Sequence, residues 1–276
     1  MDFIDSLITL ALAEDSGMGD VTTLSLLESD FRGSGVIVAK EPMVLAGLGV
    51  ASRVFTTVDP GVMLHTGFED GGRAGKDDIV MKIEGDLACM LKAERIVLNF
   101  LQHLSGIATL TRKFVDRIGH SRVKLVDTRK TTPGLRLLEK QAVRAGGAHN
   151  HRMSLYDGIL IKDNHIAVAG GVRQAIKTVR ENVSHLMKIE VETSSLKEVK
   201  EAVDEGADVI MLDNMNVSQM RKAVEYIDGR AVVEASGNVS LERIERIAGT
   251  GVDVISCGAL THQARSMDLS MRISPE

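Results

Sequence analysis

The chain has 276 residues and a formal net charge of -5, and 44% of its residues are hydrophobic, which is typical of a soluble globular protein. Its length allows one barrel-sized α/β unit or two domains. Tryptophan is absent and aromatic residues make up only 3%, so few side chains could stack on bases, which argues against nucleic acid as a partner.

The cysteines and the N-terminus predict where the protein works. Cys89 and Cys257 lie far apart without a metal-ligand spacing, which argues against a disulfide framework and favours a reducing compartment. Asp2 and Asp5 stand where a signal peptide would need basic residues. Because no apolar run is long enough to cross a membrane, we predict a cytoplasmic protein without a membrane partner.

The first part of the chain is predicted to be a small α/β region. Apolar spacing predicts a helix over residues 2–14. From 31 to 88, short apolar runs broken by Gly and Asp predict a mostly antiparallel sheet with one helix near 50–58. Residues 92–117 have the apolar stripe of a long helix that could be interrupted at Ser105 and Gly106.

After this helix the chain changes to a regular α/β alternation. Short β-branched runs alternate with helical windows, and the six runs are residues 123–128, 157–163, 187–192, 207–214, 231–237 and 252–259. Such alternation predicts a parallel sheet covered by helices, and without a dinucleotide-binding fingerprint it favours a closed or nearly closed barrel. In such barrels the chemistry gathers at the carboxyl ends of the strands.

The segment from Arg129 to His165 has an unusual excess of positive charge. It contains seven Lys or Arg residues, three His and only three acids. Several of these cations follow predicted strands, where a charge is desolvated only with a partner. The segment therefore predicts a site for a small, multiply charged anion, and we expect Arg129, His151, Arg152 and Lys162 to bind planar carboxylates or phosphates.

Two other patterns in this segment have simpler interpretations. Arg136, Lys140 and Arg144 recur at helical spacing after Pro133, which most simply predicts a solvated helix face. His149 and His151 flank Asn150, but no third histidine or cysteine has a suitable spacing, so a zinc site is not predicted.

The later strand ends combine acids with glycines. Glu192 and Asp213 end consecutive strands, where they could face ligand hydroxyls or a magnesium ion that keeps much of its water. Residues 236–238 and 257–259 are glycine-containing loops after the last two strands, a common place for phosphate in barrels. Glycine there is also ordinary turn chemistry, so spacing alone leaves both interpretations open.

Several longer motifs are more specific than periodicity. They are DTRKTTPGLR at 127–136, NHRMSLYD at 150–157, IKDNH at 161–165, EVE at 190–192, MLDN at 211–214, EASGN at 234–238 and CGALT at 257–261. With EDSGMGDVTT and AERIVLNFLQHLSGIAT in the first part, they occur in the order of the quinolinate phosphoribosyltransferase family (nicotinate-nucleotide pyrophosphorylase, carboxylating), which the chain resembles over nearly its whole length.

This resemblance implies a fold and a reaction. The fold would be an N-terminal α/β sandwich domain, residues 1–106, and an open, incompletely closed parallel α/β barrel, residues 107–267, with a tail at 268–276 that could pack back on the first domain. The enzyme would convert quinolinate and phosphoribosyl pyrophosphate into nicotinate mononucleotide, pyrophosphate and carbon dioxide, with magnesium, in NAD biosynthesis. Assembly as a homodimer or a larger homo-oligomer would be expected.

The resemblance also implies roles for individual residues. The two quinolinate carboxylates would be bound by Arg129, His151, Arg152 and Lys162, and by Arg95 from a partner subunit. Thr128 would also belong to the substrate-binding residues. Lys130 would meet the pyrophosphate, and the ribose hydroxyls and magnesium would meet Glu192 and Asp213. Lys130, Glu192 and Asp213 would be the catalytic residues, and the 5'-phosphate would lie at Ser236, Gly237, Asn238, Cys257 and Gly258.

Three alternatives were weighed against this interpretation. Lys162 follows an apolar run and could be the Schiff-base lysine of a barrel aldolase. The related pyrophosphorylase-like proteins of molybdate-transport operons differ from this chain in the NHR and IKDNH segments. A non-catalytic, ligand-binding descendant would be expected to have lost Lys130, Glu192 or Asp213, and all three are present.

Overall fold

The computed structural model describes residues 2–26, 31–119 and 121–275, and the chain forms two compact units. The first unit contains Met1–Arg112, Pro133–Gly147 and Ala264–Glu276, and the second contains Lys113–Thr132 and Ala148–Gln263. This grouping differs from a single cut between residues 106 and 107, because the segment 133–147 belongs with the first unit. None of the described helices is both long and apolar enough to cross a membrane.

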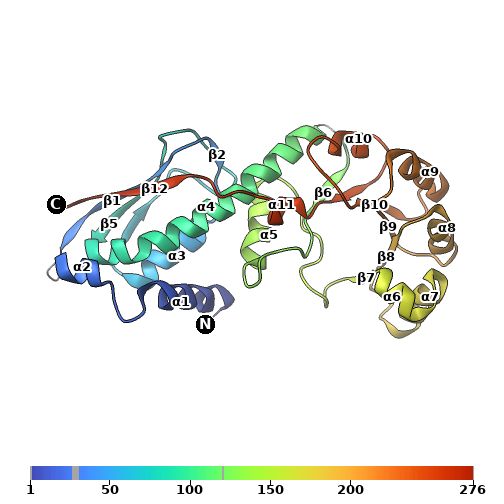
Figure 1. Ribbon diagram of the computed structural model, residues 1–276, viewed down its shortest axis with the longest axis horizontal. Helices are drawn as coiled ribbons and strands as arrows, with labels where there is room; N and C mark the ends of the chain where they lie inside the picture. Colours follow the sequence, from blue (N-terminus) through green and yellow to red (C-terminus); the bar gives the residue numbers. More distant parts are fainter. Residues whose placement is uncertain (1, 27–30, 120, 276) are drawn as a thin grey trace. The chain divides into compact units, whose positions relative to one another are not determined.

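The first unit is built on an antiparallel sheet. Its four strands lie in the order β12-β1-β5-β3, so the last strand of the chain pairs with the first (Figure 1). A small second sheet pairs β2 with β4. The strands are β1 (Arg32–Ala39), β2 (Met43–Val44), β3 (Met63–His65), β4 (Arg73–Ala74), β5 (Ile79–Asp86) and β12 (Leu269–Pro275).

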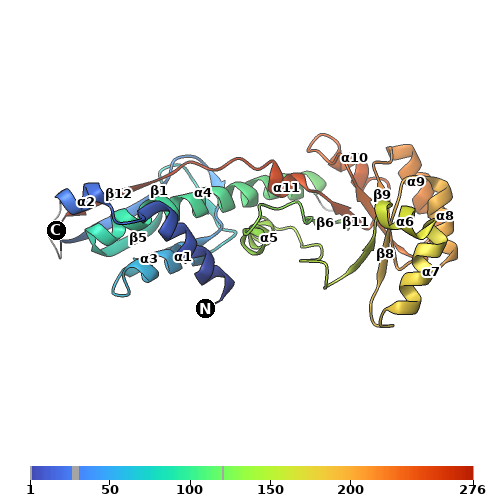
Figure 2. The same ribbon diagram turned by 60° about the horizontal axis from the view of Figure 1, so that its bottom comes forward.

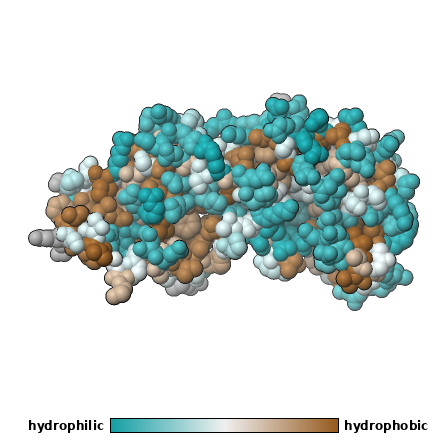
Figure 3. All heavy atoms as spheres, in the orientation of Figure 1, coloured by the Kyte–Doolittle hydropathy of each residue, from teal (hydrophilic) through white to brown (hydrophobic). Residues whose placement is uncertain are grey.

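The helices of the first unit include one of 32 residues. They are α1 (Phe3–Ser16), α2 (Val21–Leu26), α3 (Leu48–Val58), α4 (Leu87–Ile118) and α5 (Arg136–Ala145), and the last residues of α4, from Lys113 on, belong to the second unit. Helix α1 begins with a capping box between Asp2 and Asp5 and ends at Gly17, whose positive φ ends a helix readily. Figure 3 shows hydrophobic atoms at the surface near α1 and α2, where Leu10 and Leu24 are exposed.

The predicted interruption of the long helix does not occur, because α4 continues through Ser105 and Gly106. The Ser105 hydroxyl accepts a hydrogen bond from the backbone N–H of Ala46 at 3.1 Å. A Cβ on Gly106 would lie 2.0 Å from the carbonyl oxygen of Arg265, so a residue without a side chain is needed there. Ser105 and Gly106 are therefore present because they contact the segments that contain Ala46 and Arg265, and not because the helix ends there.

The solvated face predicted for Arg136, Lys140 and Arg144 is wrong for Lys140, which is only 1% exposed. On the same helix, Glu139 is buried and its carboxylate lies 2.9 Å from Nε2 of His103 on α4. Helix α5 therefore buries charged groups as well as apolar ones, and these contacts explain why it belongs to the first unit.

The second unit is a sheet of six parallel strands in the order β6-β11-β10-β9-β8-β7. The six predicted runs correspond to β6 (Lys124–Val126), β7 (Ile159–Ile161), β8 (Ile189–Thr193), β9 (Val209–Asp213), β10 (Val232–Ser236) and β11 (Val254–Ser256). Among the described residues β6 and β7 form the two edges, so the sheet does not close. The predicted fold class, an α/β chain with an open parallel barrel, is confirmed.

Helices connect and cover these strands (Figures 1 and 2). They are α6 (Asp163–Ala169), α7 (Val172–Asn182), α8 (Leu196–Asp204), α9 (Val217–Ile227), α10 (Ile244–Ala248) and α11 (Ala259–His262). The strand interiors are apolar and buried, as with Val191, Ile210 and Ala235, because helices cover the sheet. The carboxyl ends of all six strands face one edge of the unit, and the polar residues that follow them are therefore brought together.

Candidate active site

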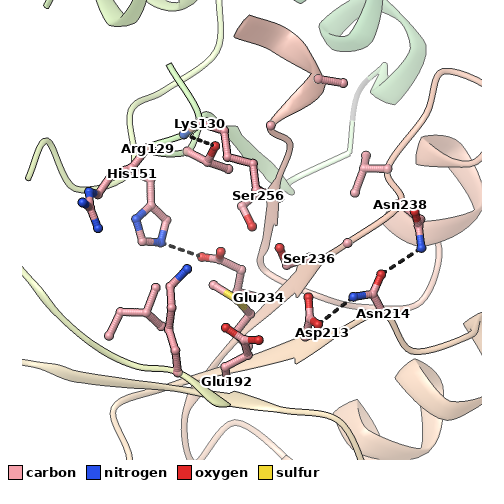
Figure 4. Close-up of a pocket in the computed structure, with 18 of the residues that line it drawn as sticks. Arg129, Lys130, His151, Glu192, Asp213, Asn214, Glu234, Ser236, Asn238 and Ser256 are labelled. Carbon is pink, nitrogen blue, oxygen red and sulfur yellow. Dashed lines mark hydrogen bonds and ion pairs between the residues drawn. The ribbon is translucent and has the colours of Figure 1, made fainter. Parts of the chain in front are cut away.

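A pocket of about 860 Å³ lies at the carboxyl ends of the strands of the second unit. This volume suits a small-molecule site. Its walls include residues from all six strand ends, and Figure 4 shows how several of these side chains converge. The pocket brings together most of the predicted site residues, namely Thr128, Arg129, Lys130, His151, Arg152, Lys162, Glu192, Asp213, Ser236, Gly237, Asn238 and Gly258.

A buried carboxylate holds the two cationic segments of the pocket together. Asp127 at the end of β6 is 0% exposed. It accepts hydrogen bonds from the side chain of Asn150 at 2.6 Å and from the backbone N–H of His151 at 2.8 Å. The segment that contains His151 is therefore fixed beside the strand that leads into Arg129.

The cations are packed close enough to affect one another. Burial lowers the pKa of Arg152, and the positive charge of Arg129 lowers it further. The Arg152 guanidinium also donates to the carbonyl oxygen of Gly158 at 2.8 Å, which fixes its direction. The backbone N–H of Lys162, at the start of α6, donates to Nδ1 of His165 at 2.9 Å. Partly buried like charges held side by side are relieved by an anion between them.

Acidic groups line another part of the pocket. Burial raises the pKa of Glu192, and the neighbouring charge of Asp213 raises it further. Glu192 lies one residue before the end of β8, Asp213 ends β9, and the two strands pair. A carboxylate pair of this kind can bind hydroxyl groups or, with water and ligand oxygens, a magnesium ion.

An asparagine links this acidic pair to the next loop (Figure 4). The side-chain amide of Asn214 donates to Asp213 at 2.7 Å and accepts from the amide of Asn238 at 2.9 Å. Between them Gly237 has φ +85°, and a Cβ there would lie 2.3 Å from Oδ1 of Asn214. The loop after β10 therefore approaches β9 more closely than any residue with a side chain would allow.

The loop after β11 lies beside Lys130. The carbonyl oxygen of Lys130 accepts a hydrogen bond from the hydroxyl of Thr261 at 2.8 Å. A Cβ on Gly258 would lie 3.0 Å from Cδ of Lys130. The side chain of Lys130 therefore passes close to the backbone of Gly258 on its way into the pocket.

Comparisons with known proteins agree with this geometry. Residues 20–105 match the family model "Quinolinate phosphoribosyl transferase, N-terminal domain", and residues 107–272 match the corresponding C-terminal domain model. The chain belongs to the quinolinate phosphoribosyltransferase family.

Individual relatives of this family match nearly the whole chain. A probable nicotinate-nucleotide pyrophosphorylase (carboxylating) of Bacillus subtilis is 43% identical over 95% of this chain and 90% of its own length. A quinolinate phosphoribosyltransferase (decarboxylating) of Nicotiana tabacum, named as mitochondrial, is 41% identical over 99% of this chain and 83% of its own. The crystal structure of NadC from Streptococcus pyogenes is 44% identical and superposes with a TM-score of 0.95, covering 99% of this chain and 97% of that one.

Two residues from the family resemblance lie outside this pocket, and for Arg95 this agrees with its expected place in the site of a partner subunit, which a single chain does not test. Arg95 belongs to the first unit, where it is exposed on α4 beside a smaller hollow of about 490 Å³. Cys257 is 1% exposed, and its backbone N–H donates to the carbonyl oxygen of Val126. Burial raises the pKa of its thiol to about 11. Neither its thiol nor its N–H is presented to the pocket.

Three residues for which no role was predicted belong to this site or contact it. Asn214 links Asp213 to the loop after β10. Glu190 and Glu234 lie within the strands β8 and β10, and both carboxylates face the ring of His151. Glu190 and Glu192 alternate with apolar residues in β8 and so share one face, a signal in the sequence that could have identified Glu190.

His151, Glu190 and Glu234 also form a group that could hold a metal ion, since their ligand atoms lie within 4.8 Å of one another. The sequence did not indicate this group, because the acids come from strands far from the histidine in the chain. Arg129, Arg152 and Lys162 line the same pocket, however, and their positive charge disfavours a cation.

Proposed function

We propose that this protein transfers the phosphoribosyl group of phosphoribosyl pyrophosphate to quinolinate and releases pyrophosphate and carbon dioxide, which forms nicotinate mononucleotide in NAD biosynthesis. The observation that carries the proposal is a single pocket with cations on one side and acids with a glycine loop on the other. Relatives named for this activity are 41–45% identical over at least 95% of the chain, which favours this enzyme over the molybdate-operon protein and the non-catalytic descendant.

The cationic side, defined by Arg129, Arg152 and Lys162, would bind the pyridine diacid. Guanidinium groups donate two parallel hydrogen bonds to a carboxylate, and lysine adds a point charge. The lowered pKa of Arg152 supports this assignment, because it reflects positive charges held together with too little solvent.

The sugar-phosphate side, defined by Glu192, Asp213 and residues 236–238, would bind the activated sugar. The two carboxylates can accept hydrogen bonds from the ribose hydroxyls. The glycine loop lets the chain approach the 5'-phosphate closely, and we assign the phosphate to this loop and to Gly258.

A magnesium ion fits the acidic pair. Burial and mutual repulsion raise the pKa of Glu192, and a divalent cation beside Glu192 and Asp213 would relieve that repulsion. Magnesium would supply positive charge for the departing pyrophosphate. Because Glu192 and Asp213 supply only part of a magnesium coordination sphere, water and ligand oxygens would complete it.

The reaction needs positioning and charge but no covalent intermediate with the protein. As the bond between ribose C1 and pyrophosphate breaks, positive charge develops on the ribose and negative charge on the leaving group. Lys130 would stabilise the leaving pyrophosphate. The quinolinate nitrogen forms the new bond to C1. The carboxylate beside the quaternised nitrogen then leaves as carbon dioxide, and the electron pair that remains on that ring carbon takes up a proton from water.

The assembly and the location of the protein are part of the proposal. Arg95 is exposed on α4, so it is placed where it could reach a neighbouring molecule, and we propose a homodimer or a larger homo-oligomer in which it completes a partner's site. The two cysteines are unpaired, which fits the reducing conditions of the cytoplasm, although the tobacco relative is named as mitochondrial.

A spectrophotometric assay tests the reaction. Loss of quinolinate absorbance should require both phosphoribosyl pyrophosphate and magnesium, and nicotinate mononucleotide and pyrophosphate should appear in equal amounts. Nicotinate is the informative alternative substrate, because it lacks the second carboxylate that the cationic side would bind. Turnover of nicotinate but not quinolinate would refute the proposal.

A further inference from the structure

The side chain of Asn214 joins two parts of the sugar-phosphate side to which the proposed reaction gives separate tasks. Its amide N–H donates to Oδ2 of Asp213 at 2.7 Å, and its Oδ1 accepts from the side-chain amide of Asn238 at 2.9 Å. Figure 4 shows the three side chains in a row. We call Asp213, Asn214 and Asn238, with the two hydrogen bonds between them, the amide relay. It runs from the end of β9 to the loop after β10.

The carboxylate of Asp213 fixes the direction of the amide relay. A carboxylate only accepts hydrogen bonds, so the NH2 group of Asn214 must face Asp213 and its carbonyl oxygen must face Asn238. Position 238 then has to supply a donor, which the NH2 group of Asn238 does. The side chain of Asn238 is therefore selected by a carboxylate that it does not touch.

The turn after β10 does not depend on these side-chain amides. The backbone N–H of Asn214 donates to the carbonyl oxygen of Ser236 at 3.0 Å, and Arg243 donates to the carbonyl oxygen of Asn238 at 2.9 Å. Asn214 and Asn238 have φ values of 54° and 50°, a left-handed conformation that glycine adopts without strain. Glycine at either position should therefore keep the turn and remove only the relay.

The position of the amide relay in the pocket decides where its hydrogen bonds count. Asn214 and Asn238 line the pocket and are exposed. Water competes for exposed amides, so the two hydrogen bonds contribute little to folding. A sugar phosphate that covers them would exclude this water and strengthen both bonds. The relay should therefore matter more for ligand affinity than for stability.

We propose that Asn214 and Asn238 are positioning residues that hold the phosphate loop, residues 236–238, at a set position relative to Asp213. A ligand whose ribose hydroxyls meet Asp213 then finds the loop already placed for its 5'-phosphate, which lowers the cost of binding both groups at once. The inference rests on the proposed function, because that function assigns the hydroxyls and the phosphate to these two places. The relay thus favours ligands that carry both groups over pyrophosphate alone.

Calorimetry tests the inference without turnover. Benzene-1,2-dicarboxylate replaces quinolinate, because it has both carboxylates but no ring nitrogen to attack the sugar. Phosphoribosyl pyrophosphate and pyrophosphate are then titrated in turn with magnesium present. We expect Asn214→Gly and Asn238→Gly each to weaken binding of phosphoribosyl pyrophosphate by about three- to tenfold, as for loss of one hydrogen bond. Binding of pyrophosphate, which does not need the loop, should stay within about twofold.

A double variant and a matched control sharpen this test. If the two amides act as one relay, the variant with both substitutions should bind phosphoribosyl pyrophosphate no more weakly than Asn214→Gly alone. Asp228 is exposed at the end of α9 with φ 44°, outside the pocket, so Asp228→Gly measures the effect of a new glycine in the left-handed conformation. It should keep wild-type affinities. All of these variants should unfold at temperatures close to that of the wild type.

The outcomes separate the inference from the proposed function. If the wild-type protein does not bind phosphoribosyl pyrophosphate, the proposed function fails and the inference fails with it. If it does bind and both single variants bind as tightly, only the inference fails. Additive losses in the double variant also overturn it, because the two amides would then act independently. Equal losses for pyrophosphate overturn it as well, because they would indicate a general disturbance of the pocket.

Discussion

The cationic side and the sugar-phosphate side of the pocket are built in different ways. The cationic side depends on long side chains whose backbones are anchored by buried groups, as Asp127 anchors His151. The sugar-phosphate side depends on short side chains and on a loop whose path only glycine permits, as at Gly237. Affinity for the diacid should therefore depend on individual charges, and affinity for the sugar phosphate on the shape of the backbone.

Removing a cation should have the largest effect. We expect Arg152→Ala or Lys162→Ala to lower kcat/KM for quinolinate by about a hundredfold or more, several kcal/mol, because a desolvated carboxylate loses its charged partner. Steady-state kinetics with each substrate varied in turn measures this effect. KM for phosphoribosyl pyrophosphate should change far less.

Control variants remove the same kind of charge outside the pocket. Lys188 lies just before β8, at the opposite edge of the sheet, and Arg221 is exposed on α9. Lys188→Ala and Arg221→Ala should keep wild-type kinetics. If Arg152→Ala and Lys162→Ala enzymes kept wild-type kinetics for quinolinate, affinity for the diacid would not depend on individual charges of the cationic side.

Loss of an acid should affect the other side. We expect Glu192→Gln and Asp213→Asn to raise the magnesium concentration for half-maximal activity by about 10- to 100-fold, because a carboxylate that holds the ion or its water is lost. KM for quinolinate should stay within about threefold. Titration of magnesium into chelator-treated enzyme gives the measurement, with Glu225→Gln as the control. An unchanged magnesium requirement in both variants would place the ion elsewhere.

The glycine loop allows the dependence on backbone shape to be tested. Gly237 and Gly170 both have φ +85°, but a Cβ at Gly237 would lie 2.3 Å from Asn214, whereas a Cβ at Gly170 would meet nothing within 4 Å. Either alanine should cost about 1 kcal/mol of stability through backbone strain. Only Gly237→Ala should displace the loop and raise KM for phosphoribosyl pyrophosphate, by about tenfold. Equal kinetics for the two variants would mean that the close approach of the loop does not matter.

The sequence predicted the scaffold and most of the pocket, for a physical reason. Parallel strands that are covered by helices read as apolar runs, and the polar residues that follow them must meet at one edge. That rule located Arg129, Lys162 and Asp213 without coordinates. The family motifs then gave these residues roles that spacing alone could not supply.

What the sequence did not predict depends on contacts between distant segments. Ser105 and Gly106 resemble a helix break, but a hydrogen bond to Ala46 and the nearby carbonyl of Arg265 account for them. Lys140 has the spacing of a solvated stripe but is buried. The partnership of His151 with Glu190 needs coordinates in the same way, because no local pattern pairs a loop histidine with an acid inside a strand.

The smallest effect is expected at Cys257, where the family resemblance implies a place beside the phosphate. The thiol is buried and its pKa is raised to about 11, so at pH 8 only about one thiol in a thousand is ionised, roughly a hundredfold fewer than for an ordinary cysteine with a pKa of 9.0. Since the thiolate is the reactive form, iodoacetamide should leave native Cys257 intact at pH 8, and reaction should accelerate as pH rises toward 11.

The Cys257→Ala variant should keep KM for phosphoribosyl pyrophosphate within about twofold, because the thiol does not line the pocket. Mass spectrometry after alkylation measures the reactivity of Cys257, and denatured protein, in which both Cys89 and Cys257 react, is the control. Steady-state kinetics measures KM of the Cys257→Ala variant. Rapid alkylation of native Cys257 with loss of phosphoribosyl pyrophosphate binding would show instead that this thiol faces the ligand. The sugar-phosphate side would then depend on a side chain that the structure places outside it.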